Sequence, residues 1–130
     1  MNSETHALEL NAPADRVFEF LAKVENLPKW AVAFCRGLEK RDGRWWVKTP
    51  EGDVTVKFDA DRRTGAIDMY AGPTPEHQML YPTRVIGLPG GRSLFLFTVI
   101  QYPGMTEAAF RAQCTPLVEQ EFPALRKQVE

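Results

Sequence analysis

The sequence has few of the residues on which most metal and catalytic sites depend. It contains two histidines and two cysteines, and its only serines are Ser3 and Ser93. A tetrahedral zinc site would need nearly all of these histidines and cysteines together, so the sequence indicates neither a metal site nor a cofactor. A Gly-rich phosphate loop, a His-Glu-x-x-His motif and a Gly-x-Ser-x-Gly motif are all missing, which leaves the catalytic residues unassigned.

Neither charge nor hydropathy points to a nucleic acid or a membrane as partner. Sixteen basic residues nearly balance seventeen acidic ones, and no basic run is interleaved with aromatic residues. The longest apolar run, Leu94–Ile100, is far shorter than the ~20 residues that span a bilayer. The polar N-terminal segment lacks the apolar centre of a signal peptide, and two cysteines make no disulfide framework. A cytoplasmic protein that does not span a membrane is therefore expected.

The length of 130 residues fits a single domain over residues 1–130. Turn signals, of which Asp42-Gly43 is the strongest, divide residues 34–102 into six short strands. We predict a further strand over Thr5–Leu10, two short helices after it, and a final helix capped by Thr106. The predicted fold class is thus α+β, with a curved antiparallel sheet of about seven strands around a long C-terminal helix. The apolar stripe of this C-terminal helix is predicted to be Phe110, Cys114, Leu117, Val118, Phe122, Leu125 and Val129. Pro116 and Pro123 are expected to bend the helix.

Turn lengths also predict which side chains face the interior. A two-residue Asp-Gly turn pairs Leu38 with Val47, and the next tight turn pairs Trp45 with Val56. Trp45 then faces inward and Trp46 outward, where an exposed aromatic side chain is suited to a partner. The later strands are predicted to add Ile67, Met69, Ala71, His77, Met79, Tyr81, Thr83, Val85, Phe95, Phe97 and Val99 to the same inner face.

Four polar or reactive side chains, two of which are considered together, have two interpretations each. Arg36 interrupts an apolar face: either a bulge turns it outward, or it stands at a cavity mouth and meets an anionic ligand group. His77 and Tyr81 lie about 13 Å apart on one strand face. They either reach one ligand from two ends, or occupy a solvated turn and the core. Cys114 is either a small core residue or a nucleophile.

Two motifs resemble the START-like, helix-grip superfamily, which includes polyketide cyclases/dehydrases, lipid-transport proteins and Bet v 1-like proteins. These are the Ala-Pro-x-x-x-Val-Phe stretch at 12–18 and the Leu-Pro-x-Trp stretch at 27–30. Segments at 65–68, 82–85, 97–98 and 102–106 are similar to a bacterial branch of that superfamily. Met69 departs from the pattern, because relatives often have histidine after the preceding Ile/Leu-Asp pair, and the two helix prolines depart as well.

The resemblance implies a hydrophobic cavity between the sheet and the last helix. The leading hypothesis is binding of an apolar small molecule of lipid, polyketide or aromatic type. The alternatives are a cyclase/dehydratase-type enzyme acting on such a ligand, and a protein-interaction domain similar to the Hsp90-activator homologues. Whether the chain is an enzyme and whether it forms a homodimer both stay open. The predicted ligand-binding residues are Trp30, Phe34, Arg36, Trp45, Phe58, Met69, His77, Tyr81, Phe97, Phe110 and Cys114.

Overall fold

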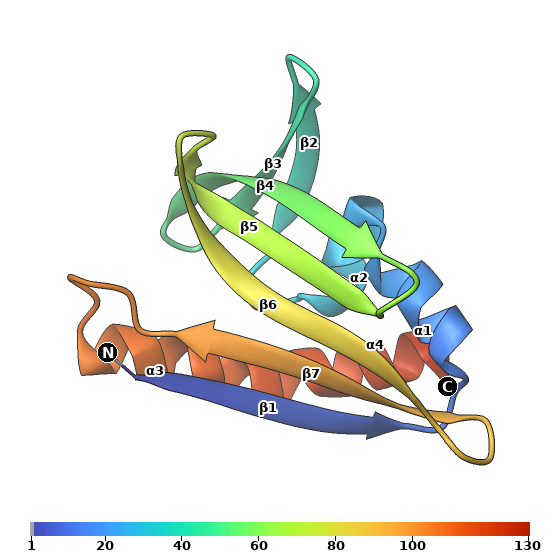
Figure 1. The fold of residues 1–130 in the computed structure, drawn as a ribbon. Helices are drawn as coiled ribbons and strands as arrows, with labels where there is room; N and C mark the ends of the chain where they lie inside the picture. Colours follow the sequence, from blue (N-terminus) through green and yellow to red (C-terminus); the bar gives the residue numbers. More distant parts are fainter. Residues whose placement is uncertain (1) are drawn as a thin grey trace.

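The computed structural model describes residues 2–130, which form a seven-stranded antiparallel sheet and a set of helices. The sheet curves around the C-terminal helix, which runs along β1 and β7 (Figure 1), as the α+β prediction requires. The strand order is β1-β7-β6-β5-β4-β3-β2. The strands are β1 (Ser3–Leu10), β2 (Gly37–Arg41), β3 (Arg44–Thr49), β4 (Gly52–Asp61), β5 (Ala66–Thr74), β6 (His77–Leu88) and β7 (Arg92–Ile100).

Short helices follow β1, and one long helical segment ends the chain. The first group is α1 (Ala14–Leu21), the 3₁₀ turn η1 (Val24–Asn26) and α2 (Leu27–Trp30). The C-terminal helix consists of α3 (Glu107–Pro116), the π-helical turn η2 (Leu117–Glu121) and α4 (Phe122–Val129). Pro28 lies in the first turn of α2, where a missing N–H costs no helical hydrogen bond.

The register predicted from turn lengths is confirmed. Leu38 pairs with Val47, and Trp45 pairs with Val56. The choice of inner face on β7 is also confirmed, because Phe95 and Val99 are fully buried. A two-residue turn with Asp42 at φ 51° and Gly43 at φ 78° joins β2 to β3, which is the backbone that a type I′ turn requires.

The predicted turn over residues 72–75 is wrong in extent. Strand β5 continues to Thr74, and only Pro75 and Glu76 connect it to β6. The register shifts between Ala71 and Thr74, so the extra residues are absorbed by an irregularity inside the strand pair. Gly72 makes this irregularity feasible, because a Cβ at that position would collide with the carbonyl oxygen of His77.

The C-terminal helix begins as predicted but its apolar stripe differs. The side chain of Thr106 accepts a hydrogen bond of 3.0 Å from the amide of Ala109, which caps α3. Within η2 the amide of Phe122 donates to the carbonyl of Leu117, five residues back, so one extra residue is inserted in this turn. Val118 is consequently 45% exposed, and its predicted burial is wrong.

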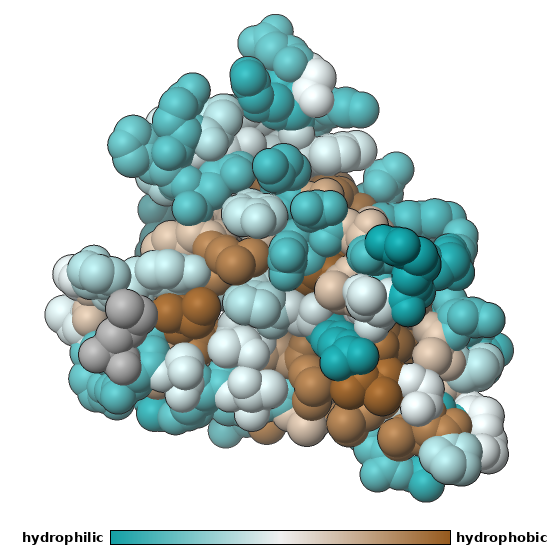
Figure 2. All heavy atoms as spheres, in the orientation of Figure 1, coloured by the Kyte–Doolittle hydropathy of each residue, from teal (hydrophilic) through white to brown (hydrophobic). Residues whose placement is uncertain are grey.

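The core packs between the concave face and the helices. Its largest fully buried side chains include Trp30, Phe95 and Phe110. The ring of Phe95 meets Trp30 at 6.0 Å and Phe122 at 6.1 Å in edge-on contacts. On the outer face the alternation leaves Ile86, Leu94 and Leu96 partly exposed. Figure 2 shows apolar side chains emerging between polar ones on this side of the molecule, whereas the end with β2 and β3 is mostly polar.

Candidate functional site

A cavity of about 560 Å³ lies between the concave face of the sheet and the helices. This volume falls within the range of small-molecule sites. Its walls come from α2 and the loop after it, from β4, β5, β6 and β7, and from α3 and η2. The lining also includes Pro50, Glu51 and Gly52, which are exposed at the β3–β4 turn, so the cavity opens to solvent at that turn.

Seven of the eleven predicted ligand-binding residues line this cavity. Trp30 is 2% exposed and Met69 is 6% exposed, so both belong to the wall as well as to the core. Arg36 lies exposed at the rim, where its Nε atom donates to the carbonyl of Ala33 over 3.4 Å. The guanidinium is therefore outside the apolar interior, and it stays a candidate for contact with a charged ligand end. The seven residues are Trp30, Phe34, Arg36, Phe58, Met69, Tyr81 and Phe97.

Two of the remaining predicted residues, Trp45 and His77, lie on strands of the sheet and do not border the cavity. Trp45 lies on β3, and the Lys40 ammonium is 5.1 Å from its ring centre. His77 is exposed at the start of β6, and its Nδ1 atom lies 2.9 Å from the Thr74 hydroxyl. The predicted joint contact of His77 and Tyr81 with one ligand is thus not supported by their positions.

The other two, Phe110 and Cys114, are buried on a different face of α3. Both are almost completely buried, at 1% and 2% exposure, but neither borders the cavity. The cavity is bordered instead by Ala112 and Gln113 from the same helix. Cys114 points toward β1, which rules out the expected position in the cavity wall. The error comes from assigning the whole apolar stripe to one space, whereas the helix presents one face to β1 and β7 and another to the cavity.

Glu121, on η2, is a polar cavity residue that the sequence analysis missed. Its side chain is buried, and Oε2 accepts hydrogen bonds from the backbone amides of Ala33 at 3.2 Å and Phe34 at 3.1 Å. Burial raises the pKa of this carboxyl above its ordinary value, and the two backbone hydrogen bonds offset only part of the shift. The sequence did contain a sign of this role. Glu121 is a carboxylate four residues after Leu117, so it lies on the helix face that the predicted apolar stripe assigned to the core.

Three more polar side chains belong to residues that border the same space. The indole Nε1 of Trp30 and the side-chain Oε1 of Gln113 are buried, and neither has a hydrogen-bond partner among residues 2–130. Burial raises the pKa of the Tyr81 hydroxyl, and the neighbouring Gln113 side chain offsets part of this effect. A buried polar atom without a partner is costly, and a ligand in the cavity could reach these two unpartnered atoms only if the Trp30 or Gln113 side chain moved.

The arrangement combines a largely apolar wall with the interior polar groups of Tyr81, Gln113 and Glu121 and with the exposed charged residues Arg36, Glu51 and Asp53. The raised pKa of Tyr81 favours the protonated phenol still further, and the raised pKa of Glu121 shifts that carboxyl toward its protonated form. A buried carboxyl of this kind is able to donate a proton or a hydrogen bond. No group of three or more metal-ligating side chains lines the cavity among the described residues.

Comparison with known proteins identifies the fold. No family model matches the sequence, and no curated protein matches it in sequence. Among solved structures, XoxI from Bacillus cereus is similar with a TM-score of 0.75 and 13% identity, over 99% of this chain and 96% of that protein. The aromatase/cyclase Zhui from Streptomyces sp. R1128 gives a TM-score of 0.63 and 22% identity, over 98% of this chain and 92% of Zhui.

A third similar structure is BexL, a di-domain ARO/CYC protein from the BE-7585A biosynthetic pathway. It has a TM-score of 0.71 and 21% identity over 98% of this chain, which spans 46% of BexL. These structures share the fold of this chain, so the predicted fold, a curved antiparallel sheet around a long C-terminal helix, is confirmed. In residues 2–130 we find no helix with the length and apolar character needed to cross a bilayer.

Proposed function

We propose that this protein binds an apolar small molecule of lipid, polyketide or aromatic type in the cavity between the sheet and the C-terminal helix. The observation that carries the proposal is the cavity of about 560 Å³ with apolar walls and few polar groups. The side chains of Tyr81 and Gln113 on the cavity wall favour a ligand with a neutral polar end, such as a hydroxyl or an amide. Arg36 at the rim favours a further acidic group near the opening.

Titration with a fluorescent fatty acid and with a fluorescent aromatic probe tests this proposal. We expect saturable binding by the wild type, and at least about tenfold weaker binding by Ala112→Trp, whose side chain fills part of the cavity. Ala108→Trp is the matched control, because Ala108 is exposed on the same helix and does not border the cavity. Absence of saturable binding of either probe, or equal binding by the two variants, contradicts the proposal.

A second candidate function is catalysis of a cyclase or dehydratase type on the same kind of ligand. The specific observation that favours it is the position of Glu121 in the cavity lining, where burial raises its pKa and so favours the protonated form that a general acid needs. Glu121 would protonate the departing hydroxyl group, which leaves as water, and the resulting carboxylate would accept the proton from the carbon next to the ketone. Glu121→Gln is then expected to keep probe binding and to lose turnover of a β-hydroxy ketone, followed by mass spectrometry as loss of water. Equal turnover by both proteins argues against this role.

The third hypothesis, a protein-interaction domain, has less support. It predicted a collapsed interior, and the interior contains the cavity. Trp46, which that hypothesis assigned to a contact surface, is partly covered by Arg41, whose guanidinium lies 5.0 Å from the ring centre.

Residence in the cytoplasm stays part of the proposal because Cys35 and Cys114 are both free thiols. Light scattering of the purified protein tests the homodimer.

A further inference from the structure

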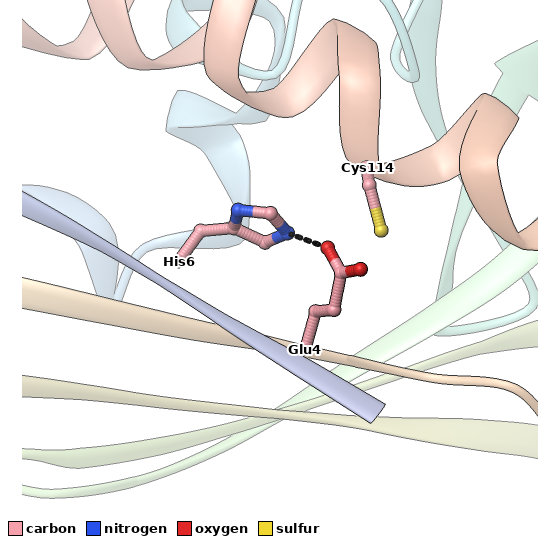
Figure 3. A group of neighbouring side chains, drawn as sticks. All are labelled: Glu4, His6 and Cys114. Atoms are coloured by element: carbon pink, nitrogen blue, oxygen red, sulfur yellow. Dashed lines mark ion pairs between the residues drawn. The ribbon is translucent and has the colours of Figure 1, made fainter. Parts of the chain in front are cut away.

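A cluster of three potential metal ligands lies outside the cavity, between β1 and α3. It consists of Glu4 and His6 from β1 and Cys114 from α3, and Figure 3 shows the three side chains pointing toward one another. One ligand atom from each residue lies within 4.8 Å of the other two. Glu4 and His6 are two residues apart on a strand, so they share the face that meets the helix.

The geometry of the cluster is close to that of a zinc site. The Nε2 atom of His6 lies 3.2 Å from Oε1 of Glu4. In a tetrahedral zinc site two such N and O ligands are about 3.4 Å apart, and a sulfur ligand is about 3.6 Å from each. The nitrogen and oxygen atoms thus already stand at ligand spacing. A side-chain movement of roughly 1 Å brings the Cys114 sulfur to the same distance.

His6 supplies a second, independent observation. Its Nε2 atom is shielded from solvent, yet it makes no hydrogen bond of acceptable geometry with any residue from 2 to 130. The short distance to Glu4 is an ion-pair distance without hydrogen-bond alignment. A buried ring nitrogen without a proper partner is unfavourable in a protein, and a metal ion is a common partner for it. The sequence indicated no metal site because only histidines and cysteines were counted, whereas the third ligand here is a carboxylate.

We propose that Glu4, His6 and Cys114 bind one Zn²⁺ ion, with a water molecule as the fourth ligand. Glu4 is the most exposed of the three, at 36% of its side chain, so the water and the incoming ion enter from that side. Binding replaces the thiol proton of Cys114 by the metal, and one proton is released to solvent. The thiolate and the carboxylate together balance the charge of the ion. This site is separate from the cavity and does not depend on its function.

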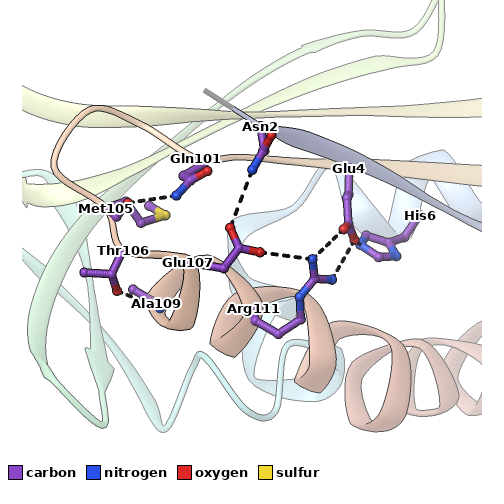
Figure 4. Close-up of polar contacts among 9 residues, drawn as sticks. All are labelled: Asn2, Glu4, His6, Gln101, Met105, Thr106, Glu107, Ala109 and Arg111. Atoms are coloured by element: carbon purple, nitrogen blue, oxygen red, sulfur yellow. Dashed lines mark hydrogen bonds and ion pairs between the residues drawn. The ribbon is translucent and has the colours of Figure 1, made fainter.

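Arg111 is the group that opposes metal binding. Its guanidinium donates to both oxygens of Glu4, at 3.0 Å and 2.7 Å. Figure 4 shows Arg111 between Glu4 and Glu107, whose Oε1 atom lies 3.7 Å from it, so a second carboxylate is available when Glu4 turns to a metal. A fixed positive charge beside a cation site weakens it. Removal of this charge is therefore expected to strengthen metal binding, which a merely structural cluster would not show.

Cobalt binding to the chelator-treated, reduced full chain tests the proposal. We expect one Co²⁺ per chain, with a near-ultraviolet sulfur-to-cobalt band and visible bands of four-coordinate cobalt, and displacement by Zn²⁺. Cys114→Ser should lose the sulfur band, and Cys35→Ser, which changes the other buried cysteine, should keep it. His6→Gln should bind at least about tenfold more weakly. Arg111→Gln should bind about tenfold more tightly at low salt, and Arg126→Gln, on the far end of the helix, should bind as the wild type does.

Several results overturn the proposal. These are absence of the sulfur band in the wild type, its persistence in a folded Cys114→Ser protein, and its loss in a folded Cys35→Ser protein. Circular dichroism shows which variants fold. If Cys114→Ser does not fold, the affinities of His6→Gln and Arg111→Gln decide, and a wild-type affinity in both of them removes the site.

Discussion

Glu121 of the C-terminal helix accepts a 3.1 Å hydrogen bond at Oε2 from the backbone amide of Phe34, which lies in the loop after α2. The same oxygen accepts from the amide of Ala33 at 3.2 Å. One buried carboxyl thus ties the loop at the cavity wall to the helix on the opposite side. The π-helical turn that contains Glu121 sets the direction of this side chain, so the irregular turn and the cavity are parts of one arrangement.

Removal of this carboxyl should destabilise the protein. Glu121→Ala leaves two backbone amides without acceptors, and we expect a loss of about 2–4 kcal/mol in the free energy of unfolding. Glu121→Gln keeps an oxygen acceptor without the charge and should cost much less. Urea unfolding at neutral pH measures both variants. Equal losses would mean that the two hydrogen bonds contribute little.

The raised pKa of Glu121 predicts a pH dependence of stability. Between the ordinary carboxyl value of 4.5 and the raised pKa, the folded chain binds more protons at this site than the unfolded chain does. The contribution of Glu121 to the free energy of unfolding therefore falls as pH rises through that window and is level above it. The free energy of unfolding of the wild type should show this fall with pH across the range, and that of Glu121→Gln should not. Parallel curves for the two proteins would show that the pKa is not raised.

Gly65 should be among the least replaceable glycines. Its φ is +78°, and a Cβ there would collide with the carbonyl oxygen of Val85, whose amide donates to Gly65 at 2.9 Å. Gly90 has a similar φ of +82° and open space around it. Both alanine variants carry the backbone strain of about 1–2 kcal/mol, but Gly65→Ala adds the collision. Thermal unfolding should rank Gly65→Ala well below Gly90→Ala, and similar melting temperatures would refute the close approach.

The π-helical turn predicts opposite tolerance at two neighbouring positions. Leu117 is 2% exposed, whereas Val118 is 45% exposed. Leu117→Ala should cost about 2–5 kcal/mol, and Val118→Ala should stay within about 0.5 kcal/mol of the wild type. Chemical denaturation of both variants checks the rotation of the helix at this point. A larger loss for Val118→Ala would indicate a regular α-helix in place of the π turn.

Two phenylalanines separate the core from the cavity wall. Phe95 is completely buried and contacts Trp30 and Phe122 edge-on, so Phe95→Ala should cost about 3–5 kcal/mol. Phe58 is only partly buried and borders the cavity, so Phe58→Ala should cost less and should alter probe binding. Denaturation and probe titration on the same two proteins separate these effects. A binding change in Phe95→Ala alone would assign the ligand to the core side.

Register in the first part of the sheet was predictable because local turns determine it. A two-residue turn at Asp42-Gly43 allows one pairing of the flanking strands, and the apolar pattern agrees with that pairing. The rotation of the C-terminal helix was not predictable in the same way. An inserted residue between Leu117 and Phe122 leaves no mark in an apolar stripe, and Val118 was consequently assigned to the wrong side.

The candidate site was predictable in its aromatic wall and not in its polar groups. Alternation along β5 to β7 assigns Met69, Tyr81 and Phe97 to the inner face without any tertiary information. Gln113 and Glu121 were missed because a search for an apolar stripe excludes polar residues on the same helix face. Their role depends on the space left between helix and sheet, which no local pattern specifies.

The strand order also has a kinetic consequence. β1 pairs only with β7, and Ser3 stands opposite Ile100, so the first strand has no neighbour in the sheet until most of the chain is in place. Near the other end of β1, the amide of Asn11 donates to Glu130 over 2.8 Å. Contacts so distant along the chain slow the search for the native state, whereas β2 to β7 pair as adjacent hairpins. Closure of the two ends of the chain against each other is thus the slow part of folding.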